Sequence, residues 1–288
     1  MAAATAVAFL YGAAQASGVA VAPGKALEAE TRIALAEREA TMVEDIVKAT
    51  CMLHLGVDAT RHGAMIDRDA KTFDAVLYAL QFGGEDYGLT REVHSKVIDA
   101  VRELKIDWLP FRERAEAALG AGVPTAEQVL WLSENDAVVL EHIEALVTEL
   151  QKVYGGKAVP LHLAVATKLA QRQATIVQRI AKETCMISAG LKADEMRDMQ
   201  PEMLSIFENT LSALRDGMPM LGIQKPTTQQ VVDQWAVVQT HWQALRETLA
   251  PVEAGGTLDT EELAEMSRRT TALTIAIDTV VSLYADEI

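Results

Sequence analysis

The feature that most constrains this chain is an internal repeat with an offset of 134 residues. At that offset residues 35–59 align with residues 169–193 without a gap, and 20 of the 55 positions from 35 to 89 are identical to their counterparts. The same register pairs Trp108 with Trp242 and extends as far as Ser133 and Ser267. An unbroken register of this length indicates that one structural unit occurs twice in the chain.

Each unit has the pattern of four helices. Apolar residues recur at helical spacing, Gly and Pro are few, and the paired glycines Gly83 and Gly84 end the second helix. Two capping boxes, Thr125-x-x-Gln128 and Asp259-x-x-Glu262, open the fourth helix at equivalent places. In the first unit the predicted helices are 27–56, 59–82, 91–119 and 126–153. Long helices joined by short loops pack as antiparallel bundles. We therefore predict an all-α fold of two tandem four-helix-bundle repeats, at residues 27–154 and 160–288.

The charge of the chain argues against two classes of partner. The formal net charge is −15, whereas binding to nucleic acid phosphates requires a basic surface. The same charge opposes adsorption to anionic lipid. Half of the residues are hydrophobic, which is enough for a large buried core. These features predict a folded, soluble protein with no nucleic acid partner.

The N-terminal sequence suggests export. Residues 2–16 are almost all small and apolar, and they end in Ala14-Gln15-Ala16, which resembles the cleavage site of a secretory signal. No Lys or Arg precedes this stretch, so the basic part of a typical signal is missing. The alternative is an alanine-rich tail. No other stretch is as long as a membrane span. We expect a signal peptide at residues 1–16 and a soluble periplasmic protein.

The first helix of the second unit resembles a known sensory domain. Its sequence, AQRQATIVQRIAKE at 170–183, is similar to the signature segment of the PilJ-type domain, the extracytoplasmic N-terminal module of type IV pilus methyl-accepting transducers. That domain is related to the sensor domain of nitrate/nitrite histidine kinases. The later segments Phe73 to Gly83 and Phe207 to Gly217 also resemble the family. The matching residues of the signature are Ala170, Arg172, Gln173, Gln178, Arg179, Ala181 and Lys182.

The match to this signature has two departures. Ala174, and Ala40 in the first unit, stand where the family has the second arginine of its Arg-Gln-Arg motif. The resemblance implies that, in the nitrate sensors, the arginine at this position is the ligand of the anion. The first unit keeps Arg38 and Lys48 but has Glu44 and Asp45 in place of Gln and Arg. The missing arginine argues against nitrate binding in the manner of the family, and the acidic residues of the first unit imply that any anion site favours the second unit.

One face of the second unit's first helix is basic. Arg172, Arg179 and Lys182 lie on this stripe, and guanidinium groups there present forked donors to an anion. We predict a small anion or carboxylate ligand near Arg172, Arg179, Lys182, Gln173 and Arg38. The alternative is a solvated face whose charges are balanced by acidic neighbours. Either way, no cofactor is expected.

A second face of the same helix consists of small residues, including Ala174, Ala181 and Cys185, and the first unit has Ala40 and Cys51 at equivalent places. Such a face suggests close approach to another helix. We predict that the two equivalent helices pack together about a pseudo-twofold axis, so that one chain imitates a symmetric dimer.

This arrangement brings the only two cysteines, Cys51 and Cys185, near the axis. Three alternatives stay open there. The cysteines form a disulfide, they pack unbonded, or they form a soft-metal site of the copper type with Met52 and Met186.

The sequence contains no motif of a catalytic site. The metalloprotease pattern H-E-x-x-H, the redox pattern C-x-x-C and the phosphate-binding loop are absent. We therefore expect no enzyme. The preferred hypothesis is a periplasmic ligand-binding or sensory module that signals to a membrane-bound receptor or transducer. The alternatives are a structural or adaptor bundle without a ligand, and a metal-handling protein.

Overall fold

The computed structural model describes residues 25–155 and 160–286, and these form eight α-helices and two short 3-10 turns without any β-strand. The predicted signal peptide at 1–16 lies outside the described residues. The helices of the first half are α1 (Lys25–His54), α2 (Ala59–Phe82), α3 (Ser95–Gly120) and α4 (Ala126–Tyr154). Those of the second half are α5 (Leu161–Ala189), α6 (Ala193–Asp216), α7 (Gln229–Glu253) and α8 (Thr260–Asp286). The 3-10 turns η2 (Glu85–Tyr87) and η3 (Pro219–Leu221) follow α2 and α6. The all-α prediction is confirmed.

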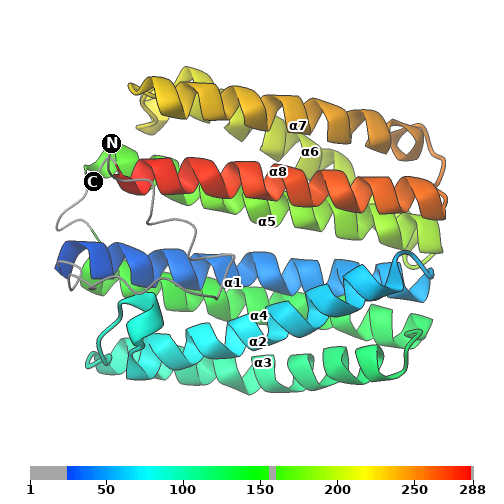
Figure 1. Ribbon diagram of the computed structural model, residues 1–288, viewed down its shortest axis with the longest axis horizontal. Helices are drawn as coiled ribbons and strands as arrows, with labels where there is room; N and C mark the ends of the chain where they lie inside the picture. The colour runs from blue at the N-terminus through cyan, green and yellow to red at the C-terminus, as the bar shows by residue number, and fades with distance from the viewer. Residues whose placement is uncertain (1–24, 156–159, 287–288) are drawn as a thin grey trace.

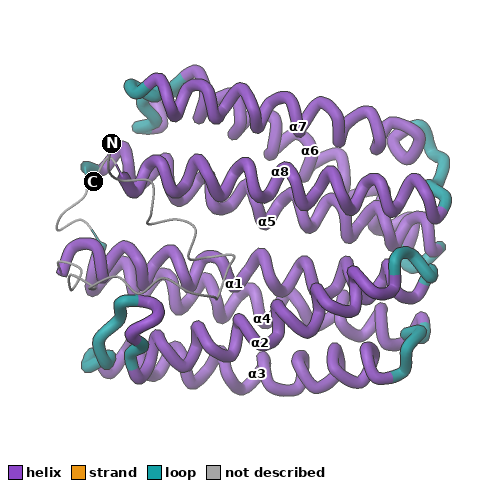
Figure 2. The backbone as a smooth tube through the Cα atoms, viewed as in Figure 1, coloured by secondary structure: helices purple, strands orange, loops and turns teal. Residues whose placement is uncertain are grey.

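The helices run antiparallel in two groups (Figures 1 and 2). Within the first group α1 packs on α2 and α4, and α3 closes the ring against α2 and α4. In the second group α5, α6, α7 and α8 have the same neighbour relations. The two groups meet chiefly where α1 packs on α5. These two helices are therefore covered both by their own bundle and by the neighbouring one.

Each group has its own apolar core. The first core is built around Phe73 and Trp108, whose rings stack with centroids 3.6 Å apart. The second core has the equivalent pair Phe207 and Trp242 at 4.1 Å. Cys51 of α1 belongs to the second core. The aromatic pairs are thus structural, in agreement with the 134-residue register.

Local backbone features recur at the same offset. Gly83 and Gly217 end α2 and α6 with φ of 83° and 84°. A Cβ atom there would lie 2.9 Å from the backbone nitrogen of Arg91, or 2.8 Å from that of Lys225, so both turns require glycine. Isolated bridges follow at Gly84–Leu89 and Met218–Ile223. The recurrence supports the proposed duplication.

The predicted helix bounds are close to the observed ones, with one larger difference. Helix α3 begins at Ser95, not at residue 91, because Glu92 and the bridge after α2 hold the preceding chain in an extended form. Both capping boxes form: Thr125 and Gln128 exchange hydrogen bonds, and so do Asp259 and Glu262. The division into units at 27–154 and 160–288 stays a proposal. None of the described helices has the length and apolar character that crossing a membrane requires.

Candidate functional site

The contact between α1 and α5 joins residues that are equivalent in the repeat. Cys51 and Cys185 form a disulfide with their Cα atoms 6.2 Å apart. Further along the same contact, the hydroxyl oxygens of Thr41 and Thr175 lie 2.9 Å apart in a hydrogen bond. In both pairs the partners are 134 residues apart, so each position meets its own counterpart. The two helices therefore approach each other through equivalent faces.

Two lysines also connect equivalent positions of α1 and α5. Here each lysine contacts a residue of the opposite helix that is the counterpart of a residue four positions before it in its own helix. The ammonium group of Lys48 donates to Oε1 of Gln178 at 2.5 Å. That of Lys182 lies 2.6 Å from Oε2 of Glu44. Residues 44 and 178 are equivalent, as are 48 and 182, so the same contact is made once in each direction. The pattern supports the pseudo-twofold relation, which remains a proposal.

Lys182 is the centre of a buried ionic cluster. Besides Glu44, its ammonium group contacts Oδ2 of Asp136 on α4 at 2.6 Å, and all three side chains are buried. Burial alone would lower the pKa of Lys182, but the two carboxylates outweigh it and hold the lysine in its charged form. Burial raises the pKa of Glu44 to about 7, assisted by Asp136 and opposed by Lys182. The predicted anion ligand Lys182 is thus already paired with acids from the first half.

Lys48 is paired in a similar way within the first half. Its ammonium group lies 2.5 Å from Asp45, which also contacts the exposed side chain of Arg68 at 3.3 Å. Burial and the charge of Asp45 raise the pKa of the neighbouring Asp69 to about 8. Burial would also raise the pKa of Asp45, but Lys48, Asp69 and Arg68 together outweigh this and the net shift is downward. One proton is therefore retained in the Asp45–Asp69 pair near neutral pH.

The structure does not gather the other predicted ligand residues into one site. Arg172 is exposed, whereas Gln173, the next residue, is buried. Arg179 is part-exposed and pairs with Glu183 at 3.0 Å. Arg38 contacts Asp278 of α8, also at 3.0 Å. The predicted basic stripe is therefore divided among separate ion pairs, and an anion site that uses all of these residues remains an untested proposal.

The predicted alternatives for the cysteines differ in what they require of the sulfur atoms. A soft-metal site with Met52 and Met186 needs free thiolates, but both cysteines are in the disulfide. Met52 and Met186 are fully buried beside them in the core. Within the described residues no group of three or more His, Cys, Asp or Glu side chains is arranged to hold a metal ion.

One pair of equivalent buried residues was predicted only in part, because Gln173 was singled out in the sequence and Glu39 was not. Glu39 of α1 is equivalent to Gln173 of α5, and each is buried with no hydrogen-bond partner for its side-chain polar atoms among the described residues. Burial raises the pKa of Glu39 well above its ordinary value, because the charged form of the carboxyl is disfavoured away from water. The signal that identifies Glu39 in the sequence is its alignment with Gln173, a neutral residue of similar shape.

These buried acids predict an unusual pH dependence of stability. Glu37 and Glu44 have a pKa of about 7 in the folded protein, against an ordinary 4.5, and Asp69 one of about 8, against 3.8. The folded state thus binds more protons than the unfolded state between these values. We expect the free energy of unfolding to fall by more than about 2 kcal/mol as pH rises from about 5 to 8.

Urea denaturation at several pH values measures this effect. Glu44→Gln places at residue 44 the side chain that its counterpart Gln178 already has, and it should make the pH dependence shallower. The single substitution Glu39→Gln, which copies the counterpart Gln173, should do the same. A midpoint that rises between pH 5 and pH 8 would contradict the assignment of these pKa shifts.

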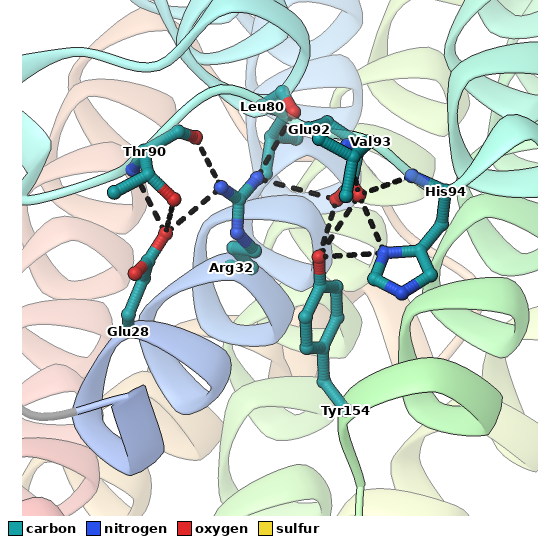
Figure 3. Close-up of polar contacts among 8 residues, drawn as sticks. All are labelled: Glu28, Arg32, Leu80, Thr90, Glu92, Val93, His94 and Tyr154. Atoms are coloured by element: carbon teal, nitrogen blue, oxygen red, sulfur yellow. Dashed lines mark hydrogen bonds and ion pairs between the residues drawn. The ribbon is translucent and has the colours of Figure 1, made fainter.

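A second polar cluster closes one end of the first bundle (Figure 3). The buried guanidinium of Arg32 donates to the carbonyl oxygen of Leu80 at 3.1 Å and to that of Thr90, and it pairs with Glu28 at 2.9 Å. On its other side it lies 3.4 Å from the buried carboxylate of Glu92. Helix α1 is thereby fastened to the segment that joins α2 and α3.

Glu92 is the acceptor that completes this cluster. Its carboxylate accepts hydrogen bonds from the backbone N–H groups of Val93 and His94, from the ring of His94 at 2.8 Å and from the hydroxyl of Tyr154. Burial would raise the pKa of Glu92, but these donors outweigh it and keep the group ionised. The equivalent of Arg32 in the second half is Ala166. The cluster is therefore a feature of the first half, and its contacts are those of a structural clamp.

Tyr154→Phe tests the clamp with a small change. The substitution removes one neutral donor from a carboxylate that keeps several others, so we expect it to lower the free energy of unfolding by about 1.5 kcal/mol. Thermal or urea denaturation measures the loss. Tyr78→Phe, at an exposed tyrosine of α2, is the matched control and should change stability by less than about 0.5 kcal/mol. Equal effects of the two substitutions would refute the role of the hydroxyl.

Comparison with known proteins finds a family model that the second half resembles. Residues 161–266 match the family described as the N-terminal domain of type IV pili methyl-accepting chemotaxis transducers, PilJ. The match runs from the start of α5 into α8, and it confirms the resemblance predicted from residues 170–183 for this part of the chain. It does not extend to the first half, where the resemblance to the family stays a proposal. No curated protein and no solved structure matched the chain.

Proposed function

We propose, from the PilJ-type transducer domain at residues 161–266, that this chain is a periplasmic sensory module in which a bound ligand changes helix packing and so signals to a membrane-bound receptor or transducer. Its first half is a second, diverged copy of the same domain. The two copies pack as a pseudo-dimer within one chain.

One observation carries this proposal. The signature residues of the family lie on α5, and two of them, Gln178 and Lys182, contact α1 of the other half. A change in the second bundle that moved α5 would therefore act directly on the first bundle. Both helices are held in register by the disulfide, which suits a rigid transmitting element. Shifts of helices at such interfaces are an established way in which ligand binding at one site is transmitted to another site.

Location in the periplasm has independent support. Structural disulfides persist in oxidising compartments and are rare in the cytoplasm, and the Cys51–Cys185 bond is buried in the core. A fusion of the full chain to alkaline phosphatase, which is active only after export, tests the location. Phosphatase activity that disappears when residues 1–16 are deleted supports export by this segment. An inactive fusion would overturn the periplasmic proposal.

Ligand-dependent packing is tested by hydrogen exchange on the purified chain. A thermal-shift screen with nitrate, nitrite, small carboxylates and Cu²⁺ first identifies stabilising compounds. A ligand at 100 times its Kd should stabilise the fold by about 2.7 kcal/mol. We expect such a ligand to change the exchange rates of amides in α1 as well as in the second half. A response confined to the bundle that binds the ligand would reject transmission through α1 and α5.

A structural or adaptor bundle without a ligand is the second candidate. It is favoured by the pairing of Lys182 with Glu44 and Asp136, which neutralises a predicted anion ligand, and by Ala174 and Ala40 in place of the family's arginine. If no compound in the screen stabilises the fold, this candidate is favoured. The metal-handling alternative requires Cu²⁺ or Cu⁺ to bind the reduced chain and to be lost in a variant without cysteines.

A further inference from the structure

A groove lies between α6 and α7 on the second bundle. Its volume is about 520 Å³, and its lining combines polar and charged side chains with the edge of the core. The floor includes Leu211 and Trp242, both buried. Around them lie two arginines, Arg215 and Arg246, together with Glu208, Ser212, Gln239, Gln243 and Glu247. The groove is on the opposite side of the second bundle from the contact with α1, since neither α6 nor α7 takes a main part in that contact.

The repeat shows what distinguishes this groove from the same place in the first bundle. The counterparts of Ser212 and Gln243 are Tyr78 and Leu109, which are larger or apolar. Tyr78 packs against Phe82 with ring centroids 5.0 Å apart. The floor is unchanged, because Trp108 is the counterpart of Trp242. At these two rim positions the second bundle therefore carries smaller or more polar side chains above a common floor.

The cations also differ between the two copies. In the first bundle Lys105 donates to Gln81 at 2.9 Å, whereas in the second the same contact is reversed and Arg215 donates to Gln239 at 3.0 Å. The groove is thus lined by a guanidinium on α6, from Arg215, and by one on α7, from Arg246. A guanidinium has five N–H donors in a planar fork, which matches a carboxylate.

Each of these arginines retains donors beyond its contacts within the protein. Arg215 uses Nε and Nη2 on Asp216 and Nη1 on Gln239. Arg246 contacts Glu208 through Nε and Glu253 through Nη1, and its guanidinium carbon lies 5.9 Å from the Trp242 ring centroid. The carboxylates of Glu208 and Glu247 and the side chains of Ser212 and Gln243 complete the lining. A ligand that fits this set carries a negative group for the arginines and a hydrogen-bond donor for the acids.

We propose that the α6–α7 groove binds a small organic carboxylate that also bears an ammonium or hydroxyl group. Its carboxylate would contact Arg215 and Arg246, and its donor group would contact Glu208 or Glu247. The proposal deepens the sensory function above, on which it rests for its biological meaning, by assigning the ligand to the second copy and naming its class. Binding itself is measured on the isolated chain and requires no signalling partner.

Calorimetric titration of the oxidised full chain tests the assignment. The probes are glycine, alanine, aspartate, glutamate, lactate and malate, with acetate and nitrate as anions that lack the donor group. We expect at least one of the first six to bind with a Kd below about 1 mM, and acetate and nitrate at least tenfold more weakly. The indole N–H signal of Trp242 in an NMR spectrum should shift on binding, because its ring forms the floor.

Two variants locate the ligand. Ser212→Tyr/Gln243→Leu fills the groove with the residues that the first bundle carries at these places, and Arg215→Gln introduces the side chain of its counterpart, Gln81. Each should weaken binding at least tenfold. The reciprocal variant Tyr78→Ser/Leu109→Gln is the matched control and should bind as the wild type does. If the filled variant fails to fold, Arg215→Gln and the Trp242 signal still decide the question.

Several outcomes would overturn the proposal. It fails if none of the six probes binds at about 10 mM, if nitrate or acetate binds as tightly as they do, or if binding persists in the filled variant. In the last case a ligand exists but its site lies elsewhere, so the sensory function survives and only the groove assignment is lost. The opposite result is also informative. If a ligand binds at the groove without changing the hydrogen-exchange rates of amides in α1, the groove assignment is supported and the proposed transmission is rejected.

Discussion

Replacing Cys51 and Cys185 together with alanine is expected to lower the free energy of unfolding by about 2–5 kcal/mol. The disulfide closes a loop with a sequence separation of 134 residues, and a cross-link over so long a loop removes much conformational freedom from the unfolded chain. It also joins the two halves at their main contact. Both cysteines are fully buried. Alanine is therefore preferred to serine, because serine would place a polar hydroxyl in the apolar core.

Chemical denaturation of three samples measures this effect. The wild type in its oxidised form should be the most stable, and the reduced wild type should resemble the double alanine variant. The reduced wild type is the matched control, because it keeps the volume of both sulfur atoms. Mass measurement without reductant checks that the oxidised chain has two hydrogen atoms fewer. Equal stability of the oxidised and reduced wild type would contradict a stabilising role for the bond.

Lys182→Met should have an effect of similar size. The substitution leaves Glu44 and Asp136 buried without the ammonium group that lies 2.6 Å from each. Breaking a buried ion pair from one side is destabilising by about 3–5 kcal/mol, because the remaining charge stays unpaired. The loss should be greatest at pH 8 and smaller at pH 5.5, where the stranded carboxyl groups take up protons. Denaturation curves at both pH values measure it.

A double-mutant cycle separates this pairing from the loss of packing. Glu44→Gln in the Lys182→Met background should recover part of the stability, since it removes one stranded charge and restores the side chain present at Gln178. The control is Lys192→Met, which removes an exposed ion pair with Glu134 at 2.8 Å and should alter stability by less than about 1 kcal/mol. No recovery in the double variant would show that Glu44 does not depend on Lys182.

Much of the fold was predictable because its determinants are local or repeated. Helical periodicity, the glycine at residue 83 and the capping boxes act over a few residues, and the 134-residue register transfers each assignment from one half to the other. The small face around Cys51 and Cys185 predicted which helices would meet. These signals do not depend on knowing the rest of the structure.

The candidate sites were less predictable, because they depend on residues from distant helices. The partner of Lys182 on α4, Asp136, has no sequence signal that links it to α5. Helix α1 also buries Lys48, which lies on the side of the helix opposite its main row of apolar residues. The burial of Lys48 follows from the position of α1 between two bundles, where its ammonium group contacts Gln178 of α5. The groove differs from its counterpart only through side chains that α6 and α7 bring together in space.

The crossed contacts of Lys48 with Gln178 and of Lys182 with Glu44 have a consequence for how such a molecule can diverge. In an assembly of two identical subunits every substitution appears twice, so a residue near the axis cannot become acidic on one side alone. Here the two sides are encoded separately. One side has a carboxylate, Glu44, and the other has an amide, Gln178, and the rims of the two bundles likewise differ. A covalently joined pair of this kind can assign recognition to one half and support to the other.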